Sequence, residues 1–168
     1  MSNQAEQSKR ALVFLNFGVI SSAGTRWLNP EAEMLEPTAL KMLEKFCQAF
    51  NADIVMVTNL AEKYSTARDF SQLFYEYGAD LPVVDVLALN GEDSEYTAAR
   101  NYMKNRPDVA WVVFETDAHP FPGARTWISV KSLTGLTLKD LSQAAEFLDR
   151  SSEHTRELAE ICRKCTQR

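Results

Sequence analysis

Three groups of polar side chains, each directly after a short apolar run, contain residue types that could bind ions or take part in phosphoryl transfer. They are Asn16 with Gly18, Thr58 with Asn59, and Glu115 with Thr116 and Asp117. Carboxylate oxygens such as those of Glu115 and Asp117 are ligands that Mg²⁺ prefers, and hydroxyl and amide groups can donate hydrogen bonds to an anion. Every strand must end in something polar, however, so the groups indicate a site only if the fold brings them together.

Other side chains could add acid–base, electrostatic or metal chemistry, and each also has a purely structural interpretation. His119, in the segment DAHPFPG, could act as an acid or a base, because an imidazole ordinarily titrates near neutral pH, or it could be an incidental loop residue. Lys131 and Arg100 are candidates for a phosphate-binding cation by position only. Cys162 and Cys165 form a CRKC motif, for which packing in a final helix is favoured over redox or zinc chemistry.

The composition is that of one ordinary globular domain, expected to span residues 11–168 of the 168-residue chain after a disordered leader at 1–10. The net charge of −5 argues against a nucleic-acid-binding protein and suits a partner of basic character. No apolar run approaches the roughly 20 residues that a membrane span requires, so no membrane association is expected. Three cysteines, an odd number, fit a reducing cytoplasm better than a disulfide framework.

Strand-like and helix-like segments alternate along the chain. Strands are expected at 11–15, 53–58, 82–89, 109–115 and 125–130, the last as a short edge strand; helices are expected at 37–50, 66–77, 94–104 and 137–149, with another from 151 or 152; 18–35 is expected to be a loop or small insertion. This alternation predicts an α/β fold with a mostly parallel sheet between two helical layers. The carboxyl ends of parallel strands share one edge of the sheet, where such folds bind ligands, and all three polar groups follow strands.

The motifs at these strand ends also occur together in a known family. The segments FLNFGVIS, VMVTNL and WVVFETD follow one another in the order of three family motifs, and SVKSLTGLTLKDLSQAAEFL is similar to the closing segment. On these segments, residues 11–149 resemble the haloacid-dehalogenase-like (HAD-like) hydrolases, and most closely the small-capped HAD domains of Swiss-army-knife RNA repair proteins. The resemblance implies a three-layer Rossmann-like fold with a minimal cap.

The resemblance also implies a chemistry that this chain lacks the groups to perform. In the family, an aspartate after the first strand attacks phosphorus, a second aspartate protonates the leaving group, and Mg²⁺ holds the phosphate. The alignment of motifs places Asn16 at the nucleophile and leaves no counterpart of the second aspartate before Gly18. It gives Thr58 a hydrogen bond to the phosphoryl group, and it gives Glu115 and Asp117 a role in holding the metal. Because an amide is a poor nucleophile, the implied site is degenerate; Asn16 could instead cap the turn after the strand.

Two functions of different classes follow from this pattern. In the first, the chain is a catalytically degenerate HAD-like protein that binds another protein, as a regulator or as an immunity-type protein that neutralises a toxin. In the second, it is a divergent Mg²⁺-dependent phosphatase or phosphotransferase that uses Glu115, Asp117 or His119 in a rearranged site. The residues expected to contact a ligand are Asn16, Thr58, Asn59 and Lys131.

Overall fold

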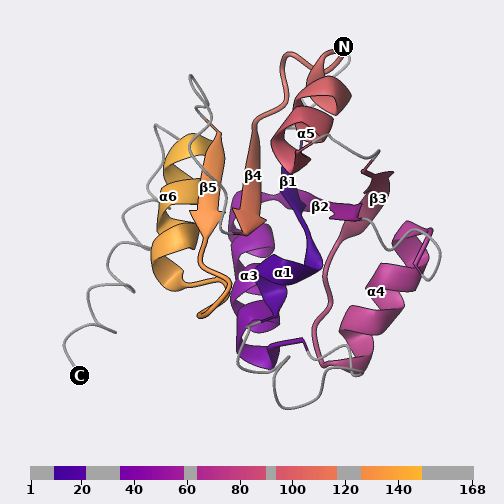
Figure 1. Ribbon diagram of the computed structural model, residues 1–168, viewed down its shortest axis with the longest axis vertical. Helices are drawn as coiled ribbons and strands as arrows, with labels where there is room; N and C mark the ends of the chain where they lie inside the picture. The colour runs from indigo at the N-terminus through magenta and orange to yellow at the C-terminus, as the bar shows by residue number, and fades with distance from the viewer. Residues whose placement is uncertain (1–9, 22–34, 59–63, 90–93, 117–125, 149–168) are drawn as a thin grey trace, which may run out of the picture.

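One parallel sheet organises the chain. The computed structural model describes residues 10–21, 35–58, 64–89, 94–116 and 126–148. The strands within these residues are β1 (Ala11–Leu15), β2 (Ala52–Thr58), β3 (Val83–Ala88), β4 (Trp111–Thr116) and β5 (Trp127–Val130), and the helices are α1 (Phe17–Ile20), α3 (Pro37–Phe50), α4 (Ala67–Glu76), α5 (Glu95–Met103) and α6 (Leu138–Leu148). The five strands lie in the order β3-β2-β1-β4-β5, with every neighbouring pair parallel, and in Figure 1 they run from β5 on the left to β3 on the right.

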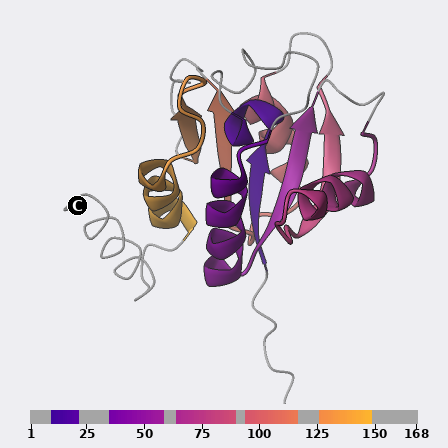
Figure 2. The same ribbon diagram turned by 90° about the horizontal axis from the view of Figure 1, so that it is seen from below.

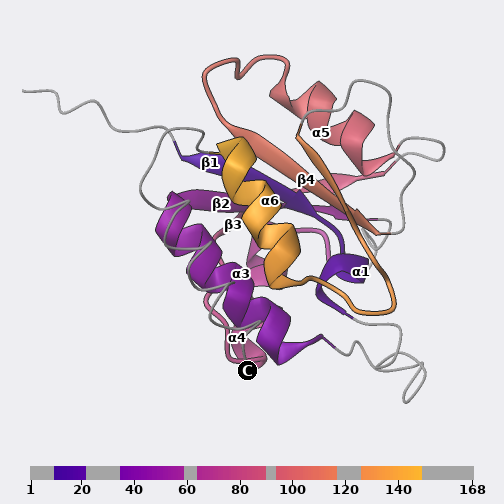
Figure 3. The same cartoon turned by 90° about the vertical axis from the view of Figure 1, so that its left-hand side faces the viewer.

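Helices cover both faces of the sheet. The apolar residues of α3, α4 and α6 form one core cluster with the sheet, and those of α5 form a second cluster on the other face. Figures 2 and 3 show this separation, with α3 and α6 on one side of the strands and α5 on the other. The expected three-layer α/β architecture is therefore confirmed, and the sheet is parallel throughout its described strands.

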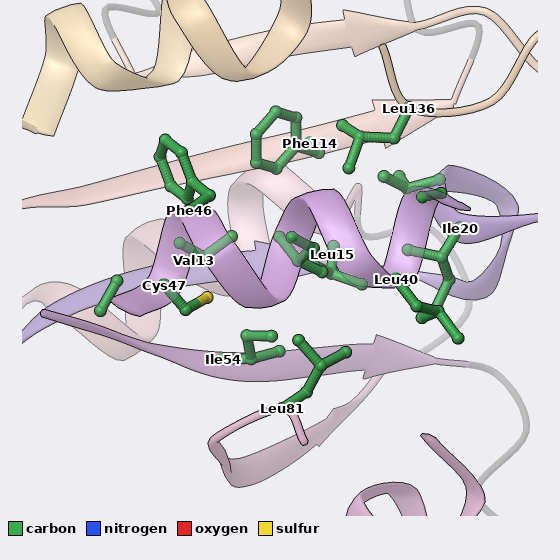
Figure 4. Packing of buried hydrophobic residues seen from close by; sticks show 14 of the residues in the cluster. Val13, Leu15, Ile20, Leu40, Phe46, Cys47, Ile54, Leu81, Phe114 and Leu136 are labelled. Carbon is green, nitrogen blue, oxygen red and sulfur yellow. The ribbon is translucent and has the colours of Figure 1, made fainter. Parts of the chain in front are cut away.

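Burial on both faces explains why β1 is an uninterrupted apolar run. Val13 and Leu15 point into the cluster beneath α3, whereas Leu12 and Phe14 point into the cluster beneath α5. Figure 4 shows the α3 side, where β1 packs against side chains of α3, β2 and β4. Cys47 of α3 belongs to this core, and burial raises the pKa of its thiol to about 12, so it acts as a small apolar side chain.

Most element boundaries follow the sequence prediction because local signals set them. Pro37 is the first residue of α3, Thr66 and Ser94 cap α4 and α5, and β5 is an edge strand as expected. The expectation of a loop over 18–35 was wrong for residues 18–20, which belong to the single-turn helix α1. One turn is too short to show helical periodicity. Of the segment expected to be an insertion or minimal cap, residues 22–34 lie outside the described residues.

Arg10, which belongs to the expected leader and is described by the structure, is bound to the sheet. Arg10 Nε donates to Asp53 Oδ1 at 2.7 Å, and Arg10 Nη1 donates to Asn51 Oδ1 at 2.6 Å. These contacts hold the start of β1 beside the start of β2, its neighbour in the sheet. Residues 1–9, like the helix expected from 151 or 152, lie outside the described part of the chain.

The outer strand β3 has an irregular register. Ile54 pairs with Val83 and Val55 pairs with Asp85, so Val84 has no partner in β2. This extra residue is a β-bulge, and Val84 is 49% exposed. The next residue, Asp85, has a carboxylate that accepts a hydrogen bond from the hydroxyl group of Tyr102 on α5, at 2.9 Å. The edge strand therefore carries an extra residue followed by a carboxylate directed at α5.

We predict that Thr66→Ala lowers the free energy of unfolding by about 1 kcal/mol. Thr66 Oγ1 accepts the N–H of Asp69 at 3.2 Å, and Asp69 Oδ2 accepts the N–H of Thr66 at 3.0 Å, which together form a capping box at the start of α4. Urea denaturation of the purified variant measures the loss. Ser65→Ala is the matched control, because it removes an adjacent exposed hydroxyl group outside the capping box. Equal losses in the two variants would contradict the prediction.

Candidate functional site

The carboxyl ends of β1 and β4 form the topological switch point of the sheet. From β1 the chain passes through α3 to β2 on one side, whereas β4 pairs with β1 on the other side. Ligands of open α/β sheets bind in the crevice at such a point. Asn16 follows β1 directly, and Glu115 and Thr116 end β4. The structure therefore brings together two of the three polar groups that the sequence indicated.

The third polar group, which begins with Thr58, lies one strand further along the same edge of the sheet. Thr58 is the last residue of β2, the neighbour of β1, and is only 3% exposed. Its carbonyl oxygen accepts the N–H of Leu89 at 3.2 Å, just beyond β3. Thr58 thus reaches the predicted edge of the sheet as a buried residue.

The side chain of Asn16 joins three elements. Its Oδ1 accepts the N–H of Val19 at 3.3 Å, which caps α1, and the hydroxyl group of Thr116 at 3.3 Å. Its Nδ2 donates to Glu95 Oε1 at 2.5 Å. Asn16 therefore has the capping role that the sequence left open as its structural interpretation, and it also binds β4 and α5.

Glu95 is a site residue that the sequence analysis missed. It is the first residue of α5, directly after the cap residue Ser94, whose hydroxyl oxygen accepts the N–H of Thr97 at 3.1 Å. A helix that follows a parallel strand begins at the carboxyl edge of the sheet, and acidic residues are favoured in its first turn. These two signals in the sequence could have placed Glu95 at the site.

Glu115 is buried beneath the N-terminus of α5. The residue is 3% exposed; its Oε1 accepts the N–H of Tyr96 at 2.5 Å, and its Oε2 accepts the indole N–H of Trp127 at 3.0 Å. Burial raises the pKa of the Glu115 carboxyl, and the nearby Glu95 raises it further, whereas the hydrogen bonds from Trp127 and Tyr96 lower it. Glu115 thus binds the start of α5 and the edge strand β5 to β4.

The magnesium site expected from Glu115 and Asp117 stays a prediction. Each carboxyl oxygen of Glu115 already accepts an N–H group and retains one further lone pair. Within the described ranges, no group of three or more His, Cys, Asp or Glu side chains gathers where a metal could bind. Asp117, the second expected ligand, lies outside those ranges.

Gly18 allows α1 to approach β4 closely. A Cβ atom at this position would lie 2.5 Å from Thr116 Oγ1 and 3.1 Å from Asn16 Oδ1. Real side chains do not tolerate the first distance, so any larger residue must displace Thr116 or move α1. The glycine that the sequence analysis assigned to the degenerate motif is therefore a packing requirement of the network around Asn16.

The two candidate cations lie on the surface. Lys131 is exposed in the turn after β5, where its carbonyl oxygen accepts the N–H groups of Thr134 and Gly135, and Arg100 is exposed on α5. Neither takes part in the described contacts of Asn16, Glu95 or Glu115. Five further residues singled out in the sequence lie outside the part of the chain that the structure describes: Asn59, Asp117, His119, Cys162 and Cys165.

A separate hollow of about 220 Å³ lies beside α4. It is lined by Tyr64, Asp69, Gln72, Leu73 and Glu76. None of the site residues predicted from the sequence lines it.

No family model, curated protein or solved structure matches the chain. The class of the protein therefore follows from its own sheet, a five-stranded parallel Rossmann-like sheet with helices on both faces. In the described residues, no helix is both long and apolar enough to cross a membrane.

We predict that Gly18→Ala lowers the free energy of unfolding by about 1–3 kcal/mol, the usual cost of overpacking. Alanine is about 1 kcal/mol better than glycine in a helix, so a loss of stability in this variant must come from crowding, first of all against Thr116 Oγ1. Urea denaturation measures the change.

The control is the same substitution in a Thr116→Ala background. Removing Oγ1 removes the nearest atom that the new methyl group meets, so Gly18→Ala should then cost less stability, although Asn16 Oδ1 at 3.1 Å remains close. An equal loss in both backgrounds would show that the clash with Thr116 is not the cause.

Proposed function

We propose that this chain is a catalytically degenerate member of the HAD-like superfamily that acts by binding another protein, as a regulator or as an immunity-type protein that neutralises a toxin. The order of the motif-like segments supports the superfamily, and the parallel Rossmann-like sheet is compatible with it. The net charge of −5 favours a basic partner, because opposite charge accelerates and orients association.

The hydrogen bond from Asn16 to Glu95 carries the proposal. Nδ2 of Asn16 lies 2.5 Å from Glu95 Oε1, so the side chain at the position of the family nucleophile acts as a donor to a carboxylate. An aspartate there has no donor when it is ionised, and it would place a second negative charge against Glu95. The surroundings of residue 16 therefore suit an amide and disfavour the attacking carboxylate.

The other described groups at this edge, those of Asn16 and Glu115, also favour a structural role over phosphoryl transfer. Asn16 Oδ1 accepts two hydrogen bonds, and each carboxyl oxygen of Glu115 accepts one. Loss of the nucleophile alone should reduce the rate by a factor on the order of a thousand or more. Binding of another protein is the function that best fits a chain with this fold and no attacking carboxylate.

An activity measurement separates this proposal from the divergent phosphatase. The purified full chain and its Asn16→Ala variant are incubated with p-nitrophenyl phosphate and Mg²⁺. We expect no turnover above buffer for either protein, together with a stoichiometric partner that co-purifies with the chain from its own cells. Turnover by the unmodified chain that disappears in Asn16→Ala would overturn the proposal and establish the Mg²⁺-dependent hydrolase.

We predict that Asn16→Asp lowers the free energy of unfolding by about 1–3 kcal/mol near neutral pH, because Glu95 loses a hydrogen-bond donor and gains a like charge. The Asn16→Asp variant should also show no phosphatase activity. Urea denaturation and the same phosphatase assay measure the two effects.

Glu95→Gln provides the matched background. A glutamine at this position can donate its amide N–H to Asp at residue 16 and removes the like charge, so the cost of Asn16→Asp should shrink in the double variant. If Asn16→Asp is as stable as the unmodified chain, residue 16 does not require an amide and the supporting argument fails.

A further inference from the structure

The hollow beside α4 has a mixed lining of charged, aromatic and apolar side chains. Asp69, Gln72 and Glu76 are exposed on α4, whereas Leu73 is buried and Tyr64 is partly buried. The three exposed residues are three, four and seven positions apart, the spacing that places side chains on one face of a helix. The hollow therefore combines two carboxylates with an aromatic ring and an apolar side chain.

Both carboxylates of the hollow can accept further hydrogen bonds. The side-chain hydrogen bond with Thr66 is the main cause that holds the pKa of the Asp69 carboxyl below its usual value, so Asp69 is ionised at neutral pH. The N–H of Thr66 donates to Asp69 Oδ2 at 3.0 Å, and Gln72 Nε2 donates to Glu76 Oε1 at 3.4 Å. Among contacts between described residues, Asp69 Oδ1 and Glu76 Oε2 accept no hydrogen bond. Each carboxylate therefore has an oxygen available to a donor from a ligand.

Tyr64 supplies an aromatic ring that its neighbours hold in place. The centroid of the ring lies 5.9 Å from that of Phe17 and 5.4 Å from that of Phe70. Phe70 is fully buried in the core cluster beneath α4. Aromatic rings attract cations over their faces, and a guanidinium both stacks on such rings and donates to carboxylates. The lining of the hollow therefore suits an arginine side chain.

Tyr75 extends this surface along α4. It is 73% exposed and follows Gln72 by three positions, so the two side chains are neighbours on the helix surface. Tyrosine is enriched at protein interfaces and among the residues that dominate their binding energy. Arg68 is the one positively charged residue of α4, and it does not line the hollow. The exposed side of α4 thus offers an aromatic anchor beside an acidic hollow.

We propose that the hollow beside α4 receives an arginine side chain of a basic protein partner, and that Tyr75 packs against the same partner. The inference rests on the proposed function, which supplies such a partner, and it names the surface that the partner contacts. The guanidinium donates to Asp69 and Glu76 and stacks on Tyr64, while its apolar stem lies against Leu73. The two carboxylates and the net charge of −5 favour this occupant over an acidic or an apolar segment.

Titration of the ¹⁵N-labelled full chain with N-acetyl-arginine amide, followed by NMR, tests the hollow. We expect saturable shifts of the backbone amide resonances of Asp69, Gln72 and Glu76, and weaker binding at high salt because ions screen the carboxylates. N-acetyl-citrulline amide, which has a similar shape without the charge, is the matched probe and should cause no saturable shift. Shifts spread evenly over the acidic residues of the surface, or equal shifts with the citrulline probe, would overturn the proposal.

Variants assign the binding to the lining side chains. Glu76→Gln removes one of the two charges and Tyr64→Leu removes the aromatic ring, so each should raise the Kd of the arginine probe about two- to fivefold. Tyr64→Phe keeps the ring and should bind as the unmodified chain does. Glu146→Gln removes an exposed carboxylate from α6 and is the matched control. A Kd that either Glu76→Gln or Tyr64→Leu leaves unchanged would contradict the proposal.

The partner that co-purifies with the chain provides a second measurement. Glu76→Gln should lower its affinity, and Tyr75→Ala should lower it by about fivefold or more if Tyr75 is an anchor of the interface. A partner that binds both variants as tightly as the unmodified chain would overturn this surface and leave the proposed function standing. The absence of any partner would instead overturn the proposed function and the role of the hollow in it, even where the arginine probe binds.

Discussion

The buried carboxyl group of Glu115 must find hydrogen-bond donors within the fold, and this requirement determines how the switch point of the sheet is assembled. The donors are the Tyr96 N–H at the start of α5 and the indole N–H of Trp127 on β5. A buried polar group left without partners is costly, so α5 must begin close to the end of β4. That placement brings Glu95 to Asn16, and Asn16 in turn binds Thr116 and caps α1. Among the residues that the structure describes, the edge at which parallel sheets usually bind ligands therefore holds a network of internal hydrogen bonds.

This network gives a physical reason why an amide suits residue 16. The indole N–H of Trp127 donates to Glu115, and the amide N–H of Asn16 donates to Glu95, so each of these carboxyl groups has a donor. A carboxylate at residue 16 would remove the donor to Glu95 and place a second acceptor against it. Within the described residues, the polar groups of this network are directed at one another.

Local signals made most of the fold predictable, and distant partners made the site harder to predict. Uninterrupted apolar runs indicate strands covered on both faces, and Thr66 and Ser94 indicate the helix starts at which they were found. The role of Glu115 depends on Trp127 and Tyr96, which are 12 and 19 positions away along the chain. The sequence alone therefore could not distinguish this role from that of a metal ligand or of a solvated residue at a strand end. Glu95 was missed for the same reason, since its partner Asn16 is 79 positions away. The helix α1 depends on one cap and one turn, which periodicity cannot reveal.

The irregular outer strand β3 limits how this molecule can meet another one. An open, regular strand edge pairs readily with a strand of a second chain, and this is a common route to aggregation and to recognition of extended peptides. Here Val84 interrupts the register of β3 with β2, and a bulge of this kind makes an edge strand a poorer template for an incoming strand. Sheet extension is disfavoured at β3, and a partner at this side of the molecule has to recognise side chains.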